Sequence, residues 1–201
     1  MSEANPTIIF DNLLVTMPYI IYVSSFFTGI VSNNYEILYF TLYVIIFGDG
    51  LNALTKKMLK KSKLIPDKLG LRPSGCGGIK AGNMCRGCGI FPSFKDSIGS
   101  RTFGFPSGHA QITSLAATFW IIYLLKKNKS KKNQHYHNVN RHNHYISILL
   151  IIVVYLLVCR QRIKSKCHNI FQIVGGTIQG FTLGISGYYL CNKIAPKTYP
   201  L

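Results

Sequence analysis

Five long apolar blocks, separated by polar or basic segments, constrain the fold of this 201-residue chain more than any other feature. Each block is nearly free of charge and lies near the roughly 17–25 residues that an α-helix needs to cross a bilayer. The blocks are Leu13 to Val31, Ile37 to Leu54, Ile112 to Leu125, Tyr145 to Cys159 and Ile170 to Leu190. A soluble helical core would not need five such blocks between Lys-rich loops. We therefore predict an all-α, polytopic membrane bundle of about five transmembrane helices.

The chain is predicted to be one membrane-embedded domain over residues 1–201. We expect helices at about 13–31, 37–54, 110–125, 145–160 and 169–190. Residues 55–105 show no periodic apolar pattern, so we predict a long structured loop, which is uncommon unless it carries a function. Residues 126–144 are rich in Lys, Asn and His. They are predicted to form a solvated basic linker, although two His-x-His pairs there could bind a metal.

The net charge of +17 lies almost wholly in the loops. Nucleic acid, anionic lipid and phosphate are all partners for such a charge. The sequence has no zinc-finger spacing, aromatic RNA-binding pattern or recognition-helix signature, so a nucleic-acid partner rests on composition alone. The apolar blocks favour a bilayer and a phosphate-bearing lipid instead.

One segment, Phe105-Pro106-Ser107-Gly108-His109-Ala110-Gln111, runs directly into the third apolar block and has the features of a helix start. Pro106 presets a turn, and Ser107 is a preferred N-cap residue. The N–H groups of Ser107, Gly108 and His109 are expected to face outward at the positive end of the helix dipole, which attracts phosphate. His109 has an ordinary pKa of about 6.5 and would stand where a leaving oxygen needs a proton donor.

Two further segments supply residues suited to phosphate. Pro73 biases Arg72 to an extended backbone that projects its guanidinium, a planar fork that fits two phosphate oxygens. Arg162 and His168 lie between the fourth and fifth blocks, and His168 shares a helix face with Gln172, four residues on. Because membrane helices alternate sides, these segments and the Pro-Ser-Gly-His turn are all expected on one face of the bundle.

Other features are predicted to be structural or stay open. Three glycines recur every four residues in the fifth block and suit close helix packing; they are Gly176, Gly180 and Gly184. Asp49 is either paired with a nearby lysine, at 56 or 57, or exposed at the membrane surface. Cys76, Cys85 and Cys88 supply only three local ligands, so a disulfide on an oxidising side or free thiols fit better than zinc.

These residues resemble the type 2 phosphatidic acid phosphatase superfamily, the membrane lipid phosphatases related to vanadium haloperoxidases. The similarity extends from about Asp49 to Gly187, and the matching residues are Arg72-Pro73, Pro106-Ser107-Gly108-His109, Arg162 and His168. The family has an Asp where this chain has Gln172, and in this respect the chain is similar to the dolichyl-diphosphatase branch. The family's Lys would fall at Ile65, so the phosphate-binding lysine stays open among Lys56, Lys63 and Lys68.

The resemblance implies a phosphatase that needs no metal or other cofactor and acts on a lipid phosphate, such as dolichyl or another polyprenyl diphosphate, or phosphatidate. His168 would form a phosphohistidine, Gln172 would orient it, and His109 would protonate the leaving oxygen. The implied phosphate-binding residues are Arg72, Ser107, Gly108, Arg162 and Lys56. Likeness to dolichyl diphosphatases also implies a site in the lumen of the endoplasmic reticulum.

A catalytically weak or inactive lipid-binding protein of the same fold is the rival function. Gln172 favours it, because an amide stabilises a developing imidazolium less than a carboxylate does. A vanadium haloperoxidase is disfavoured, since those relatives are soluble.

Overall fold

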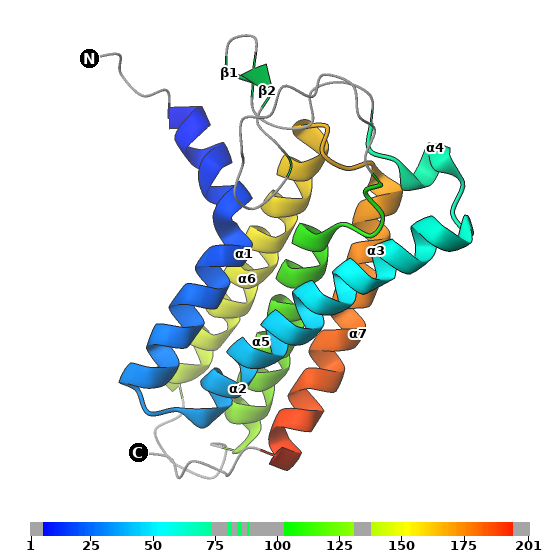
Figure 1. The fold of residues 1–201 in the computed structure, drawn as a ribbon. Coiled ribbons are helices and arrows are strands. Elements are labelled where there is room, and N and C mark those ends of the chain that lie inside the picture. The colour runs from blue at the N-terminus through cyan, green and yellow to red at the C-terminus, as the bar shows by residue number, and fades with distance from the viewer. Residues whose placement is uncertain are drawn as a thin grey trace.

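A computed structural model gives the fold and describes residues 6–73, 80–81, 84–85, 88, 103–130 and 138–194. The elements are α1 (Pro6–Val31), α2 (Tyr35–Tyr43), the π-helix η1 (Val44–Gly50), α3 (Leu51–Ser62), α4 (Asp67–Gly70), β1 (Lys80–Ala81), β2 (Met84–Cys85), α5 (Gly108–Ser130), α6 (Asn138–Lys164) and α7 (Ile170–Ile194). The two short strands pair antiparallel. Apart from them the described chain is helical, as the apolar blocks predicted (Figure 1).

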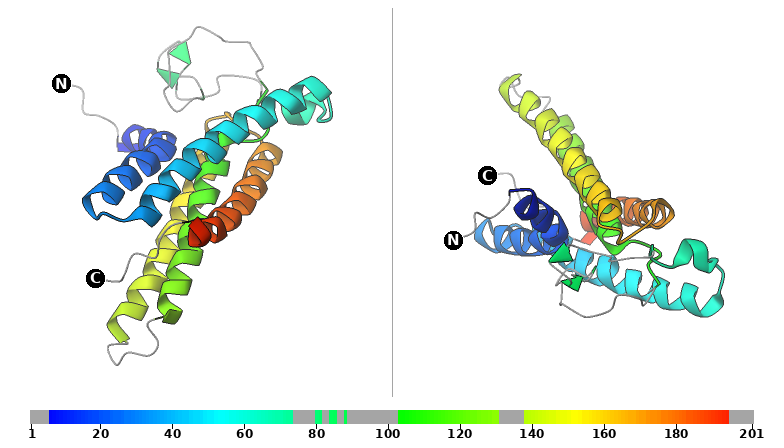
Figure 2. Two further views of the ribbon diagram at one scale, coloured as in Figure 1. Left: turned by 60° about the horizontal axis from the view of Figure 1, so that its bottom comes forward. Right: turned by 90° about the horizontal axis from the view of Figure 1, so that it is seen from above.

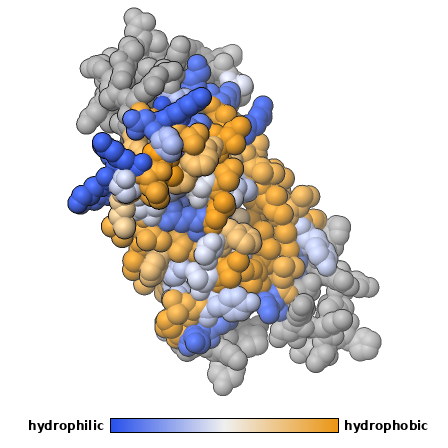
Figure 3. Space-filling model, turned by 90° about the vertical axis from the view of Figure 1, so that its right-hand side faces the viewer, coloured by the Kyte–Doolittle hydropathy of each residue, from blue (hydrophilic) through white to orange (hydrophobic). Residues whose placement is uncertain are grey.

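The described part of the chain has four helical segments that are long and apolar enough to cross a membrane. They are Ile9–Val31, Tyr35–Ser62, Gly108–Lys126 and His144–Lys164. α7 has 25 residues and lies against α5, although its Gly and Gln residues make it less apolar. Large apolar side chains cover much of the outer surface (Figure 3), which suits contact with lipid. The chain is therefore a multi-pass helical membrane protein.

The hydrophobic core lies where α2, η1, α5 and α7 meet. The ring of Phe40 from α2 packs 4.7 Å, centroid to centroid, from that of Phe119 on α5, and Tyr188 from α7 closes the cluster. α5 is the most buried of the four candidate spans. Figure 2 shows α5 and α6 as an antiparallel pair, crossed obliquely by the run from α2 to α3. α5 is thus the central helix, and its first residues are held from several sides.

The glycine stripe of α7 lets its backbone lie directly against α5. A Cβ added at Gly176, Gly180 or Gly184 would collide with backbone atoms of residues 107, 111 and 115 respectively. Only residues without a side chain allow two helices to approach this closely. The predicted packing role of these glycines is confirmed, and it fixes the start of α5 against the start of α7.

The predicted loop at 55–105 is wrong at its first residues. Residues 51–62 form α3, which continues α2 and η1 as one helical run, and residues 67–70 form α4. Lysines interrupt the apolar pattern here, but Leu, Met and Lys are all strong helix formers. Lys57, Lys60 and Lys61 are exposed, so the helix leaves the apolar region with its charges in water.

The predicted linker at 126–144 is also too long, because α5 continues to Ser130 and α6 begins at Asn138. His135 and His137 lie outside the described residues, while His142 and His144 belong to α6.

Asp49 has a different partner from the predicted lysine. The Tyr22 hydroxyl of α1 donates to Asp49 Oδ2 over 2.7 Å. This hydrogen bond links the π-helix η1 to α1. Another hydrogen bond links η1 to α5, because Gln111 Nε2 donates to the Gly48 carbonyl over 2.9 Å.

Candidate active site

The segments that carry the predicted site residues meet at one end of the bundle. The end of α3, the start of α5, the end of α6 and the start of α7 all lie there (Figure 1). Alternation of the helices across the membrane therefore brings the Arg-Pro, Pro-Ser-Gly-His and Arg-to-His segments to a common face.

Arg72 lies beside the turn before α5 because two extended segments pair there. Leu71 and Phe103 form an antiparallel bridge. A Cβ on Gly104 would stand 2.7 Å from Cγ of Arg72 and 2.6 Å from Oε1 of Gln172. The missing side chain at Gly104 allows Arg72, the turn and α7 to come into contact.

His168 and Gln172 form a buried pair. Nδ1 of His168 lies 2.9 Å from Oε1 of Gln172, and the side chains are 2% and 0% exposed. Gln172 Nε2 lies 3.0, 3.1 and 2.8 Å from the carbonyl oxygens of Leu69, Gly70 and Leu71. Because carbonyl oxygens only accept, the amide must present Nε2 to them and Oε1 to His168. Neutral His168 therefore carries its proton on Nδ1, which leaves the Nε2 lone pair available.

Asn169 holds this pair in place from the N-cap of α7. Its Oδ1 accepts from the Gln172 N–H over 2.9 Å, and its Nδ2 donates to the Leu69 carbonyl over 3.1 Å. Asn169 is a site residue that the motif spacing does not reveal. A capping rule could have found it, since Asn just before an apolar block is a preferred helix start.

The start of α5 differs in one respect from the sequence expectation. α5 begins at Gly108, and Ser107 Oγ lies 3.5 Å from the Ala110 N–H, in the N-cap position. The Ser107 N–H, however, donates to the Gln172 carbonyl over 2.9 Å and does not face outward. The start of α7 packs closely against this turn and covers the Ser107 N–H. Ser107 is fully buried, whereas Gly108 is half-buried.

His109 is directed toward α1. Its Nε2 lies 2.9 Å from the Val15 carbonyl, and the side chain is 5% exposed. Since a carbonyl can only accept, the Nε2 nitrogen must carry a proton in this contact. Val15 is 94 residues away in the chain, so no local spacing points to it. His109 thus holds a proton ready on the nitrogen that faces α1.

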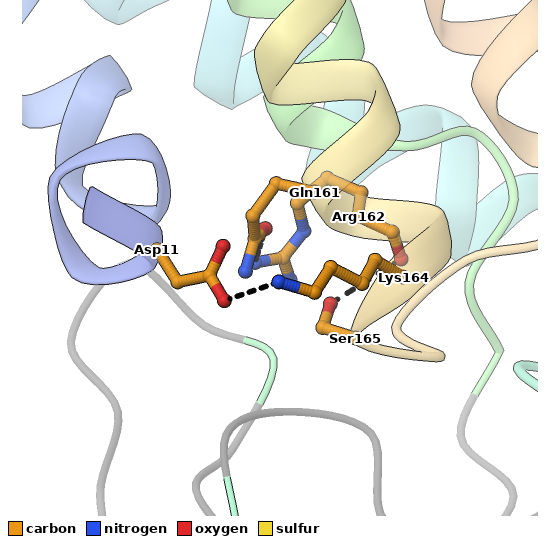
Figure 4. Close-up of polar contacts among 5 residues, drawn as sticks. All are labelled: Asp11, Gln161, Arg162, Lys164 and Ser165. Carbon is orange, nitrogen blue, oxygen red and sulfur yellow. Dashed lines mark hydrogen bonds and ion pairs between the residues drawn. The ribbon is translucent and has the colours of Figure 1, made fainter. Parts of the chain in front are cut away.

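Arg162 is almost fully buried, at 1% exposure, and is held by backbone. Its Nη2 donates to the Cys88 carbonyl over 2.6 Å, and Nη1 lies 3.5 Å from Oε1 of Gln161. Figure 4 shows Arg162 beside a separate contact in which Lys164 meets Asp11 of α1 at 2.9 Å. Among the residues that the structure describes, the buried Nε atoms of Arg162 and Arg72 have no hydrogen-bond partner.

The structure separates the three lysines that the sequence leaves open. Lys56 is half-buried on α3, while Lys63 and Lys68 are exposed. The charge of Lys56 also acts on both His168 and His109. Of the three lysines, Lys56 is therefore the one whose charge reaches both histidines.

The electrostatic field at the site is strongly positive. Burial lowers the pKa of His168 well below its usual value, and the charges of Arg162 and Arg72 lower it further. The hydrogen bond to Gln172 opposes this only in part. Burial also lowers the pKa of Arg72. Within the described ranges the only ion pair is Lys164 with Asp11, so these cations have no carboxylate partner there.

A disulfide joins Cys88 to Cys167, the residue before His168. Its Cα atoms are 5.5 Å apart, and the two residues are separated by 79 positions. This bond agrees with the disulfide alternative for Cys88, although Cys167 is too far along the chain for spacing to suggest it. The side chains of Cys76 and Cys85 lie outside the described residues.

A sequence model of one protein family, described as the PAP2 superfamily, matches residues 66–195. The match includes Arg72, the Pro-Ser-Gly-His turn, Arg162 and His168. No curated protein and no solved structure is similar enough to the chain to count as a match.

Proposed function

Because the chain belongs to the PAP2 superfamily, we propose that it is an integral-membrane phosphatase acting on a phosphomonoester or diphosphate of a lipid. Membership supports a phosphatase-type activity, and the apolar helices indicate that the substrate is met in a bilayer. The residues proposed for the chemistry are His168, Gln172, His109, Arg72, Arg162, Lys56 and Gly108.

The observation that carries this proposal is that one buried and two half-buried cations, Arg162, Arg72 and Lys56, act on a neutral histidine and have no carboxylate partner among the described residues. Uncompensated buried charge is costly, and an unpaired buried donor adds to that cost. Arg72 and Arg162 each keep a buried Nε that has no partner in the described part of the chain. A tetrahedral phosphate would supply the missing acceptors and the missing negative charge.

In the proposed first step, the Nε2 lone pair of His168 attacks phosphorus and the bond from phosphorus to the leaving oxygen breaks. Gln172 keeps the proton on Nδ1 and fixes the ring. Arg72, Arg162 and Lys56 neutralise the phosphoryl oxygens.

His109 is proposed to act as the general acid in its imidazolium form, which the negative charge of the bound substrate favours. It gives its Nε2 proton to the leaving oxygen and returns to the neutral ring, so Nε2 must exchange the Val15 carbonyl for the substrate. Water then attacks the phosphohistidine and returns a proton to His109. The bond from phosphorus to nitrogen breaks, inorganic phosphate is released, and His168 recovers its lone pair. No metal takes part in this sequence.

Within the family, we propose a polyprenyl or dolichyl diphosphate as the substrate class and a site facing the lumen of the endoplasmic reticulum. Gln172 supports this, because the dolichyl-diphosphatase branch resembles the chain at that position. Its amide also has a structural task that a carboxylate would fail, since the two N–H groups of Nε2 are shared among three carbonyl oxygens within 3.1 Å.

The test is phosphate release by purified protein in detergent, with chelator present. Dolichyl diphosphate, phosphatidate and diacylglycerol pyrophosphate should be compared, with His168→Ala as the matched inactive variant. We expect release from the polyprenyl substrate by the wild type alone. Lipid binding without release from any substrate would instead identify an inactive lipid-binding protein.

A further inference from the structure

The disulfide between Cys88 and Cys167 and the proposed phosphate-binding residue Arg162 form one connected structure. Cys88 contributes its sulfur to Cys167 and its carbonyl oxygen to Arg162 Nη2, at 2.6 Å. The Arg162 carbonyl in turn accepts from the N–H groups of Cys167 and His168, at 3.1 and 3.2 Å. Residue 88 is thereby joined at two points to the turn between α6 and α7.

This connected structure is buried at the candidate site. Cys167 is 0% exposed, Cys88 is 7% exposed, and both flank groups assigned to the chemistry. The Cys88 carbonyl is the closest acceptor of the Arg162 guanidinium, since its other contact, with Gln161, is at the limit of a hydrogen bond. Without the disulfide, residue 88 would be held less firmly against Arg162. The side chains of Arg162 and His168 would then be less rigidly positioned and more exposed to water.

We propose that Cys88 and Cys167 are positioning residues whose disulfide holds Arg162 and His168 in their working geometry, and that the site therefore faces an oxidising compartment. The catalytic part of this inference rests on the proposed phosphatase function. Formation of the bond removes two electrons and two protons from the thiols, which a disulfide donor of that compartment accepts. In the cytosol, glutathione and thioredoxin would keep both thiols reduced.

Charge alone would suggest the opposite orientation. Most Lys and Arg residues of the chain lie on the site side, and short loops rich in them usually stay in the cytosol. Arg162 is however buried at the site and Lys56 and Arg72 are half-buried there, where their proposed role is to bind phosphate. A covalent bond that the cytosol would reduce is the more specific signal, so we infer a non-cytosolic site.

The positioning role is tested with the double variant Cys88→Ala/Cys167→Ala, which leaves no single thiol to mispair. Cys191→Ala is the matched control, because Cys191 is a buried free cysteine at the far end of α7. We expect the double variant to lose about tenfold or more in kcat, as a displaced nucleophile does. The acidic limb of its pH profile should move to higher pH, since a more exposed His168 regains its ordinary pKa.

A variant that is merely less stable would lose active protein without moving the pH limb. Labelling of His168 by diethylpyrocarbonate, read by mass spectrometry, should be faster in the double variant and needs no activity. Wild-type kcat, pH profile and labelling rate in that variant would overturn the positioning role, as would free Cys88 and Cys167 thiols in a non-reduced peptide map of the wild type. If the protein released no phosphate from any substrate, the peptide map would still test the disulfide and the labelling rate would still test its effect on His168.

Sidedness is tested with a tag fused after Leu201 in sealed endoplasmic reticulum microsomes. α7 starts at the site and ends at the opposite end of the bundle (Figure 1), so a lumenal site places the tag outside. Digestion of the tag by added protease, without detergent, is the expected result. A tag that is protected until detergent is added would overturn the compartment assignment.

Discussion

Gln172 links three parts of the candidate site at the scale of single residues. It accepts from His168, donates to the carbonyls of residues 69–71, and gives its own carbonyl to the Ser107 N–H. A carboxylate could accept from His168, and the backbone carbonyl would still accept from Ser107, but a carboxylate could not donate to residues 69–71. The departure from the family's Asp is therefore matched by the backbone that surrounds it.

Gln172→Glu should separate these tasks. The new carboxylate would still accept from His168, and its charge should raise the His168 pKa and move the acidic limb of activity to higher pH. Its other oxygen would face three carbonyls without donating to them. The Leu69 and Gly70 carbonyls keep donors from Asn169 and from the N–H groups of residues 104 and 105, but the Leu71 carbonyl loses the one donor it has among the described residues, which costs roughly 1–3 kcal/mol. We therefore expect a lower unfolding temperature together with the shifted pH profile. An unfolding temperature equal to that of the wild type would show that the three contacts contribute nothing.

The two histidines should fail differently. His168→Ala should abolish turnover, because no other described group is placed to attack phosphorus. His109→Ala should leave a phosphoenzyme that forms and accumulates when the leaving group is good, since the missing acid matters most for poor leaving groups. Trapping with radiolabelled substrate after an acid quench checks both. Equal residual activity in the two variants contradicts the assigned roles.

Helix packing, at the scale of elements, determines whether the site forms at all. Gly180→Ala would push a Cβ into the backbone of α5, and overpacking of this kind typically costs about 1–3 kcal/mol. Gly50→Ala is the matched control, because a Cβ there meets nothing within 4 Å and alanine is the better helix former. We expect Gly180→Ala to lower both the unfolding temperature and kcat, and Gly50→Ala to lower neither. Equal behaviour of the two would mean that α5 and α7 pack less closely than described.

Local patterns predicted the elements better than the contacts between them. The apolar blocks indicate the membrane helices, and the glycine spacing predicts the seam of α7 with α5. The helix at residues 51–62 is not evident from the same pattern, because its lysines are exposed beyond the apolar part. The Val15 carbonyl at His109 and the Cys88 partner of Cys167 are long-range contacts, which depend on how helices pack and not on spacing.

The whole molecule is a strongly basic bundle that exposes apolar side chains and brings Arg162, Arg72 and Lys56 together around His168 at one end. The chain carries +17, and its buried site cations have no carboxylate within the described ranges. The free protein therefore bears a cost of charge repulsion that an anionic ligand would relieve. Phosphate or vanadate should stabilise the folded state, by about 2.7 kcal/mol at 100 times the dissociation constant.

The free energy of unfolding should decrease as the pH falls. Burial and the charges of Arg162 and Arg72 hold the pKa of His168 well below its ordinary value, so folded His168 stays neutral while the unfolded chain still takes up a proton. The contribution of His168 is therefore fully present above about pH 6.5 and is lost as the pH falls from there toward the folded pKa. Vanadate should reduce this loss, because its negative charge raises the His168 pKa and favours the protonated ring. Thermal unfolding in detergent between pH 5 and 8, with and without vanadate, measures both effects, and His168→Ala should show the weaker pH dependence. Unfolding temperatures that rise on acidification, or that are the same with and without vanadate, would mean that the cations around His168 do not form an anion site.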